Sequence, residues 1–278
     1  MDSCGSSRTS VPEWYKRKNA VRRGQSLQLK WHGTAAVEII SDSGRILFDP
    51  FVPLKSSGID VRIEDYDGFD TIFVTHGHVD HIYNLPEIAA RNPDVRIYCT
   101  KTPYQTLRRR GVPKDNLRKI RYGQSWLVNG VLIHALHGRH AVLPKASPLL
   151  ALEMLRSPHR GNLPFLLREH LRCPENDETV FYQIEADGKS AAVMGSLNLR
   201  EEVDYPQNMD LLVLPYNGWT DNYPPAVQVI ERLKPKRVLL DHFDESFPPF
   251  TRPVDLKPLL EKYPGRVRPM KLDITEQV

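Results

Sequence analysis

The chain has little cysteine, and its few cysteines are scattered. Cys4, Cys99 and Cys173 are the only three in 278 residues, and no two of them form a C-x-x-C pair. An odd and scattered count argues against a disulfide framework and favours a reducing compartment. The lack of paired cysteines also excludes a zinc knuckle built on cysteine.

Long apolar runs are absent as well. No stretch approaches the roughly 18 uncharged apolar residues that a membrane-spanning helix needs. The opening segment, MDSCGSSRTSVPEWYKRKNA, is polar and lacks the apolar core of a secretory signal. We therefore expect a cytoplasmic protein that does not enter a membrane.

The chain also has little excess charge of either sign. Its net charge is +4, with 26% charged and 40% hydrophobic residues, as in an ordinary globular protein. A mild positive charge permits an anionic substrate but does not point to nucleic acid. We interpret the basic clusters at residues 16–23 and 108–110 as solvated surface. The expected partner is a small-molecule substrate, and the oligomeric state is left open, a homo-oligomer included.

The apolar pattern predicts an arm followed by one mixed domain. Residues 1–24 form a polar arm, and residues 25–278 form the domain. Strand patterns cover 27–31, 35–40, 45–51, 69–75, 95–100, 118–122, 125–128, 130–136, 179–186, 190–195, 210–216, 237–242 and 267–272. Helices are expected from about residue 84, at 102–111, at 225–233 and at 254–262. The chain divides loosely into two halves, each with strands first and strand–helix units afterwards.

Residues 141–178 interrupt this pattern. They carry periodic Leu, Met and Phe with interspersed Pro, which predicts one or two helices within an insertion. Such an insertion can act as a lid that roofs a site with apolar surface. The alternative is a helix pair that packs its apolar stripe onto the body of the domain.

A dense group of polar residues follows the predicted strand 69–75. The segment THGHVDH places His76, His78, Asp80 and His81 within six positions. By composition, a chance H-x-H-x-D-H is roughly a one-in-a-thousand event in this chain. Imidazole and carboxylate together suit zinc, iron or manganese. The alternative is that the histidines are structural and that Asp80 caps a helix.

The segment THGHVDH resembles the motif T-H-x-H-x-D-H of the metallo-β-lactamase-fold hydrolases. The segment LKWHGTAAVEIISDSGRILFDPF is similar to the opening of the ascorbate-phosphate lactonase-like branch. The resemblance covers roughly residues 27–270. It implies an α+β fold, a four-layer αββα sandwich with its site at one edge of the paired sheets. It also implies that Asp49 lies under the metal loop and orients the ligands.

The resemblance implies further ligands later in the chain. A third histidine is needed at the end of a strand, and we predict His140, with His137 as the alternative; His134 is assigned to a strand face. The last histidine is His242, after the strand 237–241. The implied sets are His76, His78 and His140, and Asp80, His81 and His242. They would hold one or two divalent ions, zinc first, with manganese or iron as alternatives. Asp80 is also the predicted catalytic carboxylate, which orients water or accepts its proton.

One expected ligand is missing from the sequence. The family usually has an aspartate that bridges two metals, and this chain has Ser196 in its place, a poor ligand that we place beside the metals. Three explanations stay open. Hydroxide alone joins the two ions and Ser196 binds it, or a carboxylate substitutes (Glu201, Glu202 or Asp244), or one ion or none binds. We favour two weakly coupled ions or one.

The motif predicts hydrolysis but does not identify the substrate. We expect a small ester, lactone or phosphoester. Candidate substrate contacts are Arg139, Tyr216, Asn217 and Trp219. The alternatives are a phosphodiesterase or nuclease of the same fold, a thiol-dependent hydrolase like glyoxalase II, and a catalytically degenerate binding protein, the last suggested by Ser196.

Overall fold

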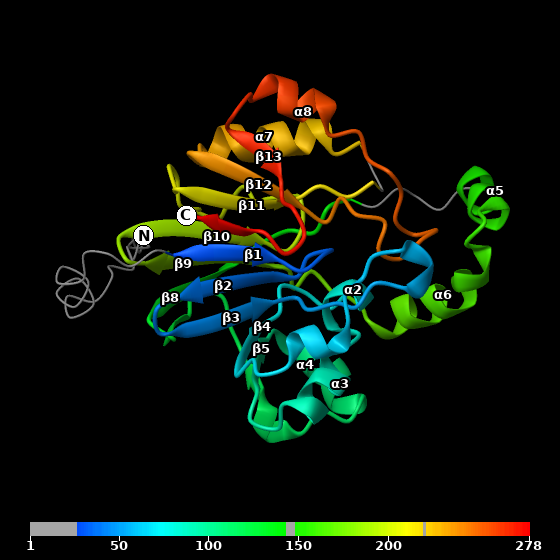
Figure 1. The fold of residues 1–278 in the computed structure, drawn as a ribbon, viewed down its shortest axis with the longest axis horizontal. Helices are drawn as coiled ribbons and strands as arrows, with labels where there is room; N and C mark the ends of the chain where they lie inside the picture. The colour runs from blue at the N-terminus through cyan, green and yellow to red at the C-terminus, as the bar shows by residue number, and fades with distance from the viewer. Residues whose placement is uncertain (1–26, 143–147, 219–220) are drawn as a thin grey trace, which may run out of the picture.

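A computed structural model describes residues 27–142, 148–218 and 221–278 of the chain (Figure 1). The predicted polar arm at 1–24 lies outside the described residues. Within these ranges, no helix combines the length and the apolar character needed to cross a bilayer. Two seven-stranded sheets occupy the middle of the molecule, with helices on their outer faces.

The first sheet has the strand order β14-β1-β2-β3-β4-β5-β6. Its strands are β1 (Gln28–Trp31), β2 (Val37–Ser41), β3 (Gly44–Phe48), β4 (Thr71–Phe73), β5 (Arg96–Cys99), β6 (Leu117–Lys119) and β14 (Thr275–Gln277). Strands β14 to β3 pair antiparallel, whereas β3 to β6 pair parallel. Helices join β4 to β5 and β5 to β6, whereas only short 3-10 turns lie in the crossover from β3 to β4.

The second sheet repeats this plan in the second half of the chain. Its order is β13-β12-β11-β10-β9-β8-β7. The strands are β7 (Ser125–Val128), β8 (Val131–His137), β9 (Val180–Ala186), β10 (Lys189–Met194), β11 (Leu211–Pro215), β12 (Arg237–Asp241) and β13 (Val267–Pro269). Strands β7 to β10 pair antiparallel and β10 to β13 pair parallel. The predicted division into two similar halves is confirmed.

Alternating apolar residues hold the two sheets together. The inner faces form one core in which Phe48, Phe73 and Tyr182 are fully buried. The Phe73 ring lies 5.4 Å from that of Tyr182 and 5.6 Å from that of Phe48, centroid to centroid. Aromatic contacts of this kind add to the free energy gained by burial.

Helices cover the two outer faces and complete four layers (Figure 1). On the first sheet these are α2 (Val79–Ile82), α3 (Leu85–Arg91) and α4 (Lys101–Arg109); on the second, α7 (Tyr223–Leu233) and α8 (Lys257–Lys262). Short 3-10 turns are η1 (Lys55–Ser57), η2 (Ile63–Tyr66), η3 (Lys114–Asn116) and η4 (Arg160–Asn162). The predicted α+β fold, a four-layer αββα sandwich, is confirmed. The assignment of residues 25–278 to one domain stays a prediction.

The predicted insertion at 141–178 contains two helices, α5 (Pro148–Arg156) and α6 (Leu163–Arg172). They lie beyond one end of the sandwich and not on its layers (Figure 1). No residue of α5 is buried, whereas α6 buries Leu163 and Leu166 against Phe51, Phe247 and Phe250. Helix α6 thus packs apolar residues onto loops of the domain, as the alternative interpretation predicts, and the lid role of the insertion stays a prediction.

Candidate metal centre

The predicted ligands all follow the carboxyl ends of strands. Such ends meet at one edge in each parallel part of a sheet, so loops after different strands converge there. Asp49 follows β3, His76 and His78 follow β4, His140 follows β8, Ser196 follows β10 and His242 follows β12. Asp80 and His81 lie in the short helix α2 directly after the β4 loop. The fold therefore brings together residues that are up to 193 positions apart, as Asp49 and His242 are.

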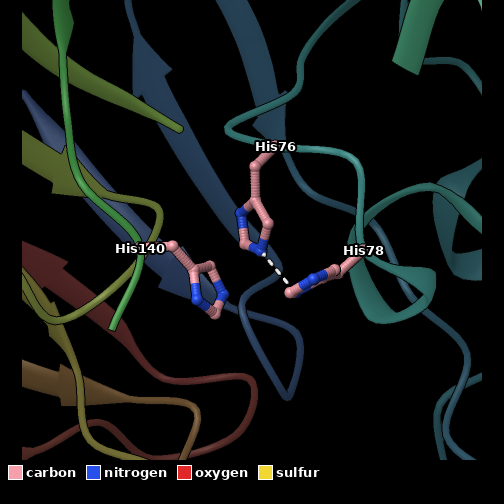
Figure 2. Close-up of side chains that lie close together, drawn as sticks. All are labelled: His76, His78 and His140. Atoms are coloured by element: carbon pink, nitrogen blue, oxygen red, sulfur yellow. Dashed lines mark hydrogen bonds between the residues drawn. The ribbon is translucent and has the colours of Figure 1, made fainter. Parts of the chain in front are cut away.

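The first triad consists of His76, His78 and His140. Their three rings point toward one another, with His140 facing the pair from the other side (Figure 2). Their candidate ligand atoms lie within 4.8 Å of one another, and His76 Nε2 is 3.2 Å from His78 Nδ1. Tetrahedral zinc with Zn–N bonds of 2.0–2.1 Å separates its nitrogen ligands by about 3.3 Å. The spacing of this pair fits a shared cation.

His140, and not the alternative His137, belongs to this triad. The His140 Nδ1 donates a hydrogen bond to the Ala141 carbonyl at 2.8 Å, which leaves Nε2 to face the other two rings. His137 lies within β8, where its ring stacks on Tyr122 and its Nε2 contacts the Asp177 carbonyl at 3.0 Å. The alternative is therefore wrong, because His137 is engaged elsewhere.

The second triad consists of Asp80, His81 and His242, which are all buried. Asp80 Oδ2 lies 2.9 Å from His242 Nε2 and 3.4 Å from His81 Nε2. Two imidazole nitrogens and a carboxylate oxygen thus converge on one point, a donor set that suits a divalent cation. The two triads adjoin, since the ring centroids of His76 and His81 are 3.9 Å apart.

Asp49 contacts His81 and the Thr75 segment beside the ligands, in the position that the resemblance implies. Its Oδ2 lies 2.8 Å from His81 Nδ1, so the opposite ring nitrogen of His81 turns toward Asp80. The same carboxylate accepts hydrogen bonds from the Thr75 amide at 2.8 Å and the Thr75 hydroxyl at 2.5 Å. That hydroxyl is 3.1 Å from His76 Nδ1. A single carboxylate therefore orients a ring in each triad, as partners of metal-bound histidines do.

The first triad is uncharged at neutral pH. Burial and the neighbouring imidazoles hold the pKa of His76 well below its ordinary value of 6.5. Burial, reinforced by His140, lowers the pKa of His78 to about 3. Burial also lowers the pKa of His140. Neutral imidazoles keep a lone pair for coordination, so these three need lose no proton to bind a cation.

The second triad carries charge of both signs. Burial disfavours the imidazolium of His81, but the carboxylates of Asp49 and Asp80 outweigh it and raise its pKa to about 10. Burial likewise opposes ionisation of Asp80, yet His81 and His242 hold its pKa well below 3.8. The pKa of His242 is raised by Asp80 against the effect of burial. Without a cation, protons therefore neutralise this triad.

Ser196 lies at the metal centre, where it is a hydrogen-bond partner of the loop that carries His140. Its hydroxyl accepts a hydrogen bond from the Ala141 amide at 2.9 Å and borders the cavity. None of the three suggested carboxylates replaces it. Glu201 and Glu202 are exposed beside another pocket, and Asp244 accepts a 2.9 Å hydrogen bond from the Thr34 amide. The explanation that one of these carboxylates substitutes for the bridging aspartate is therefore wrong, because none of them borders the metal cavity.

Asp241 is a buried carboxylate that sequence interpretation missed. Neither of its oxygens has a hydrogen-bond partner among the described residues, and nor has Nδ1 of the adjacent His242. Burial raises the pKa of Asp241 to about 7. The sequence shows Asp241 only as the last residue of an apolar strand, so no pattern marks its carboxylate as part of the site.

A cavity of about 310 Å³ opens above the two triads. Its floor holds both triads with Gly195, Ser196, Pro215 and Asn217. The lid and a nearby loop supply the roof, namely Leu150, Ala151 and Met154 of α5, Leu167 and His170 of α6, and Phe247 and Phe250. The roof is therefore apolar except for one imidazole.

The four predicted substrate contacts differ in their placement. Asn217 lines the cavity. Tyr216 is buried instead against α7 and α8, because alternation along β11 turns Leu212, Leu214 and Tyr216 to the helix side. Arg139 is exposed and does not line the cavity, since His140 takes the site-facing position of that loop. Both placements contradict the prediction. Trp219 lies outside the described residues.

His170 and Gly77 contribute to the site without having been predicted. The His170 ring centroid is 5.3 Å from that of His78, and its side chain lines the cavity. Only the lid fold brings it there, so no sequence motif could have identified it. A Cβ at Gly77 would lie 2.3 Å from the Pro174 carbonyl oxygen. The end of the lid segment therefore packs directly on the turn between two ligand histidines.

Comparison with known proteins agrees with this geometry. Residues 44–243 match the family model described as the beta-lactamase superfamily domain, so the chain belongs to that superfamily. A UPF0173 metal-dependent hydrolase of Methanobrevibacter smithii is 30% identical over 116 residues, 41% of this chain and 46% of the relative. Another, of Desulfitobacterium hafniense, is 38% identical over 65 residues, 23% of this chain and 27% of that one. The chain thus matches less than half the length of these relatives.

A solved structure shares the fold. Igni18, a metallo hydrolase from the archaeon Ignicoccus hospitalis, superimposes with a TM-score of 0.64 at 21% sequence identity. The match covers 91% of this chain and 98% of that one. It extends over the sheets and their helices together, which agrees with the four-layer architecture.

Proposed function

We propose that the chain is a metal-dependent hydrolase that cleaves an uncharged ester or lactone with an apolar substituent. The observation that carries the proposal is the position of the two triads at the floor of a cavity with an apolar roof. The same cavity therefore has metal ligands on one side and apolar side chains that can contact a hydrophobic group on the other.

The donor set favours zinc. Three neutral imidazoles with an open side match a catalytic zinc site, and manganese or iron accept the same kinds of ligand. When bound, such a cation lowers the pKa of a water molecule and polarises the bond under attack. The contribution of the chain is to hold the ring nitrogens in place, that of His140 through the Ala141 carbonyl and that of His81 through Asp49.

We assign to Asp80 the role of orienting the attacking water and accepting its proton. Its pKa is held well below 3.8, so it stays ionised at neutral pH. Its contacts with His81 and His242 both use Oδ2, which leaves Oδ1 for a proton. A carboxylate at this position would serve as the general base where the water lies within hydrogen-bond reach of it.

The cavity lining favours an uncharged substrate over a phosphoester. No lysine or arginine lines it among the residues that the structure describes. An anionic phosphoester would find no side-chain cation there, whereas an ester or lactone needs none. Leu150, Met154 and Phe250 would meet an apolar substituent. We assign to the His170 ring a hydrogen bond to a substrate oxygen, since it is the polar group of the roof.

The test is turnover by metal-loaded protein on three substrate types: nitrophenyl acyl esters of increasing chain length, a lactone and bis(nitrophenyl) phosphate. We expect ester and lactone cleavage, with kcat/KM rising with chain length as apolar area is buried. His78→Ala should lower turnover by about a thousandfold or more, because it opens the first triad. The matched control is His134→Ala. His134 lies on β8, does not line the metal cavity, and its Nδ1 is 2.7 Å from the Ser125 hydroxyl oxygen.

Three results would overturn parts of the proposal. Preferential cleavage of the phosphodiester would refute the substrate class. Equal ester turnover in the His78 variant and the wild type would refute the catalytic role of the centre. Tight metal binding without turnover on any of the three substrates would favour a binding protein.

A further inference from the structure

Exposed apolar side chains gather on the lid. Six of the eight large hydrophobic residues exposed in the described part of the chain lie between residues 142 and 171. Five of them are leucines of α5 and α6; Leu167 borders the metal cavity, and we name the other four the lid patch: Leu149, Leu152, Leu155 and Leu171. Leu171 is 82% exposed and Leu149 is 67% exposed. Scattered single leucines are common on protein surfaces, but a group of this kind marks an interaction site.

Helix α5 is apolar on two opposite sides. At 100° per residue, Leu149, Leu152 and Leu155 fall on one side of the helix. Leu150 and Met154 fall on the other side, where they line the metal cavity. A helix that is apolar on both sides is expected where both sides are covered. The cavity lies against one side of α5, and none of the described residues covers the lid patch on the other side.

Arginines surround the lid patch. Residues 148–172 contain four arginines (Arg156, Arg160, Arg168, Arg172) and two glutamates. Glu153 is paired with Arg252 at 3.1 Å. Glu169 is buried, and one of its oxygens lies 2.8 Å from Arg168 and 3.3 Å from Arg172. The acidic groups are thus already neutralised, and the exposed face of the lid keeps a positive charge.

A second cavity adjoins α6 on its basic side. It measures about 650 Å³ and is lined by four arginines, Arg109 and Arg110 of the α4 end with Arg168 and Arg172 of α6. Each guanidinium has five N–H donors, and the shared Glu169 carboxylate can satisfy only a few of them. The remaining donors suit the oxygens of a phosphate group, to which arginine binds in a bidentate manner.

Contrary to the expectation from the sequence that the protein does not enter a membrane, we propose that the lid patch docks on an anionic lipid surface. Leucines on one side of a helix and arginines on its flank form the pattern of helices that lie in a membrane interface. The leucines of α5 and α6 would enter the apolar layer, while Arg168 and Arg172 meet headgroup phosphates. A symmetric contact with a second copy of the chain is disfavoured, because it would bring together two patches that carry the same positive charge.

The test is co-sedimentation of the full chain with vesicles, in chelator so that it does not depend on the proposed function. Vesicles of phosphatidylcholine are compared with vesicles containing about 30 mol % phosphatidylserine. We expect binding to the anionic vesicles and its loss in the triple variant Leu149→Ser, Leu155→Ser, Leu171→Ser. The control is Leu127→Ser with Ile274→Ser, residues that are 45% and 49% exposed elsewhere. Circular dichroism confirms that each variant is folded.

The charge component is tested separately. Arg168→Gln with Arg172→Gln should weaken vesicle partitioning about thirtyfold, while Arg96→Gln with Arg121→Gln, both exposed elsewhere, should not. Three results would overturn the proposal: no binding to anionic vesicles at low salt, equal loss in the leucine control, or self-association in light scattering that the triple leucine variant abolishes. The last result would assign the patch to a second copy of the chain.

Discussion

The two triads differ in the protons that they hold, which predicts how they take up metal. The first triad is neutral at about pH 7 and has nothing to release. In the second triad His81, with its pKa raised to about 10, is protonated and must lose that proton before its Nε2 can coordinate a cation. Metal should therefore fill the first triad first, and the second triad in competition with protons.

The size of this competition follows from the pKa of His81. About three pH units separate a pKa of about 10 from pH 7, which corresponds to roughly 4 kcal/mol, or about a thousandfold in affinity. The second triad should thus bind its cation about tenfold more tightly for each unit by which the pH rises towards 10. The raised pKa of His242 adds in the same direction.

The assay is isothermal titration of chelator-treated protein with zinc, in buffers of different ionisation enthalpy. We expect one event without proton release, and a weaker one that releases about one to two protons near pH 7. His81→Ala should remove the second event and leave the first. Two equal sites at pH 7, or proton release that is unchanged in the His81 variant, would refute the reasoning.

Further predictions concern the scaffold of the site and the stability of the metal-free protein. Gly77→Ala should lower the free energy of unfolding by about 1–3 kcal/mol in denaturant titrations, because its Cβ meets the Pro174 carbonyl, whereas Gly161→Ala, which meets nothing, should be near neutral. Asp49→Asn should make zinc binding at the second triad less dependent on pH, in titrations at pH 7 and pH 9, since it removes one of the two carboxylates that hold the proton on His81. Thermal unfolding of metal-free protein should show highest stability near about pH 6.5. The stability from the raised pKa of His81 is lost as the pH rises towards 10, and the low pKa of His78 makes acid destabilising.

The sequence predicts the half of the site that is local. His76, His78, Asp80 and His81 lie within six positions directly after a buried strand, so chain connectivity alone holds them together. Their spacing is recognisable without knowing the rest of the fold. His242 is distant in sequence from these four, but it was also predictable, because no other histidine follows His170.

The residues contributed by the lid and by strand ends are predicted less well. His170 is brought to His78 by the path of the insertion, which no periodicity specifies. Tyr216 and Asn217 are neighbours in sequence, yet alternation turns only Asn217 to the cavity. Neighbouring residues at the end of a strand point to opposite faces of the sheet. Loop composition alone therefore cannot tell which of the two side chains points into the cavity.

Ser196 shows how the missing bridging carboxylate and the proton balance of the second triad are connected. A bridging aspartate would place another negative charge between the triads, and that charge would favour both cations together. Here the serine hydroxyl instead accepts the Ala141 amide and so stabilises the loop that carries His140. The negative charge at the second triad comes from Asp49 and Asp80, which also hold the proton on His81. We therefore expect the two sites to be weakly coupled, with occupancy of the second dependent on pH.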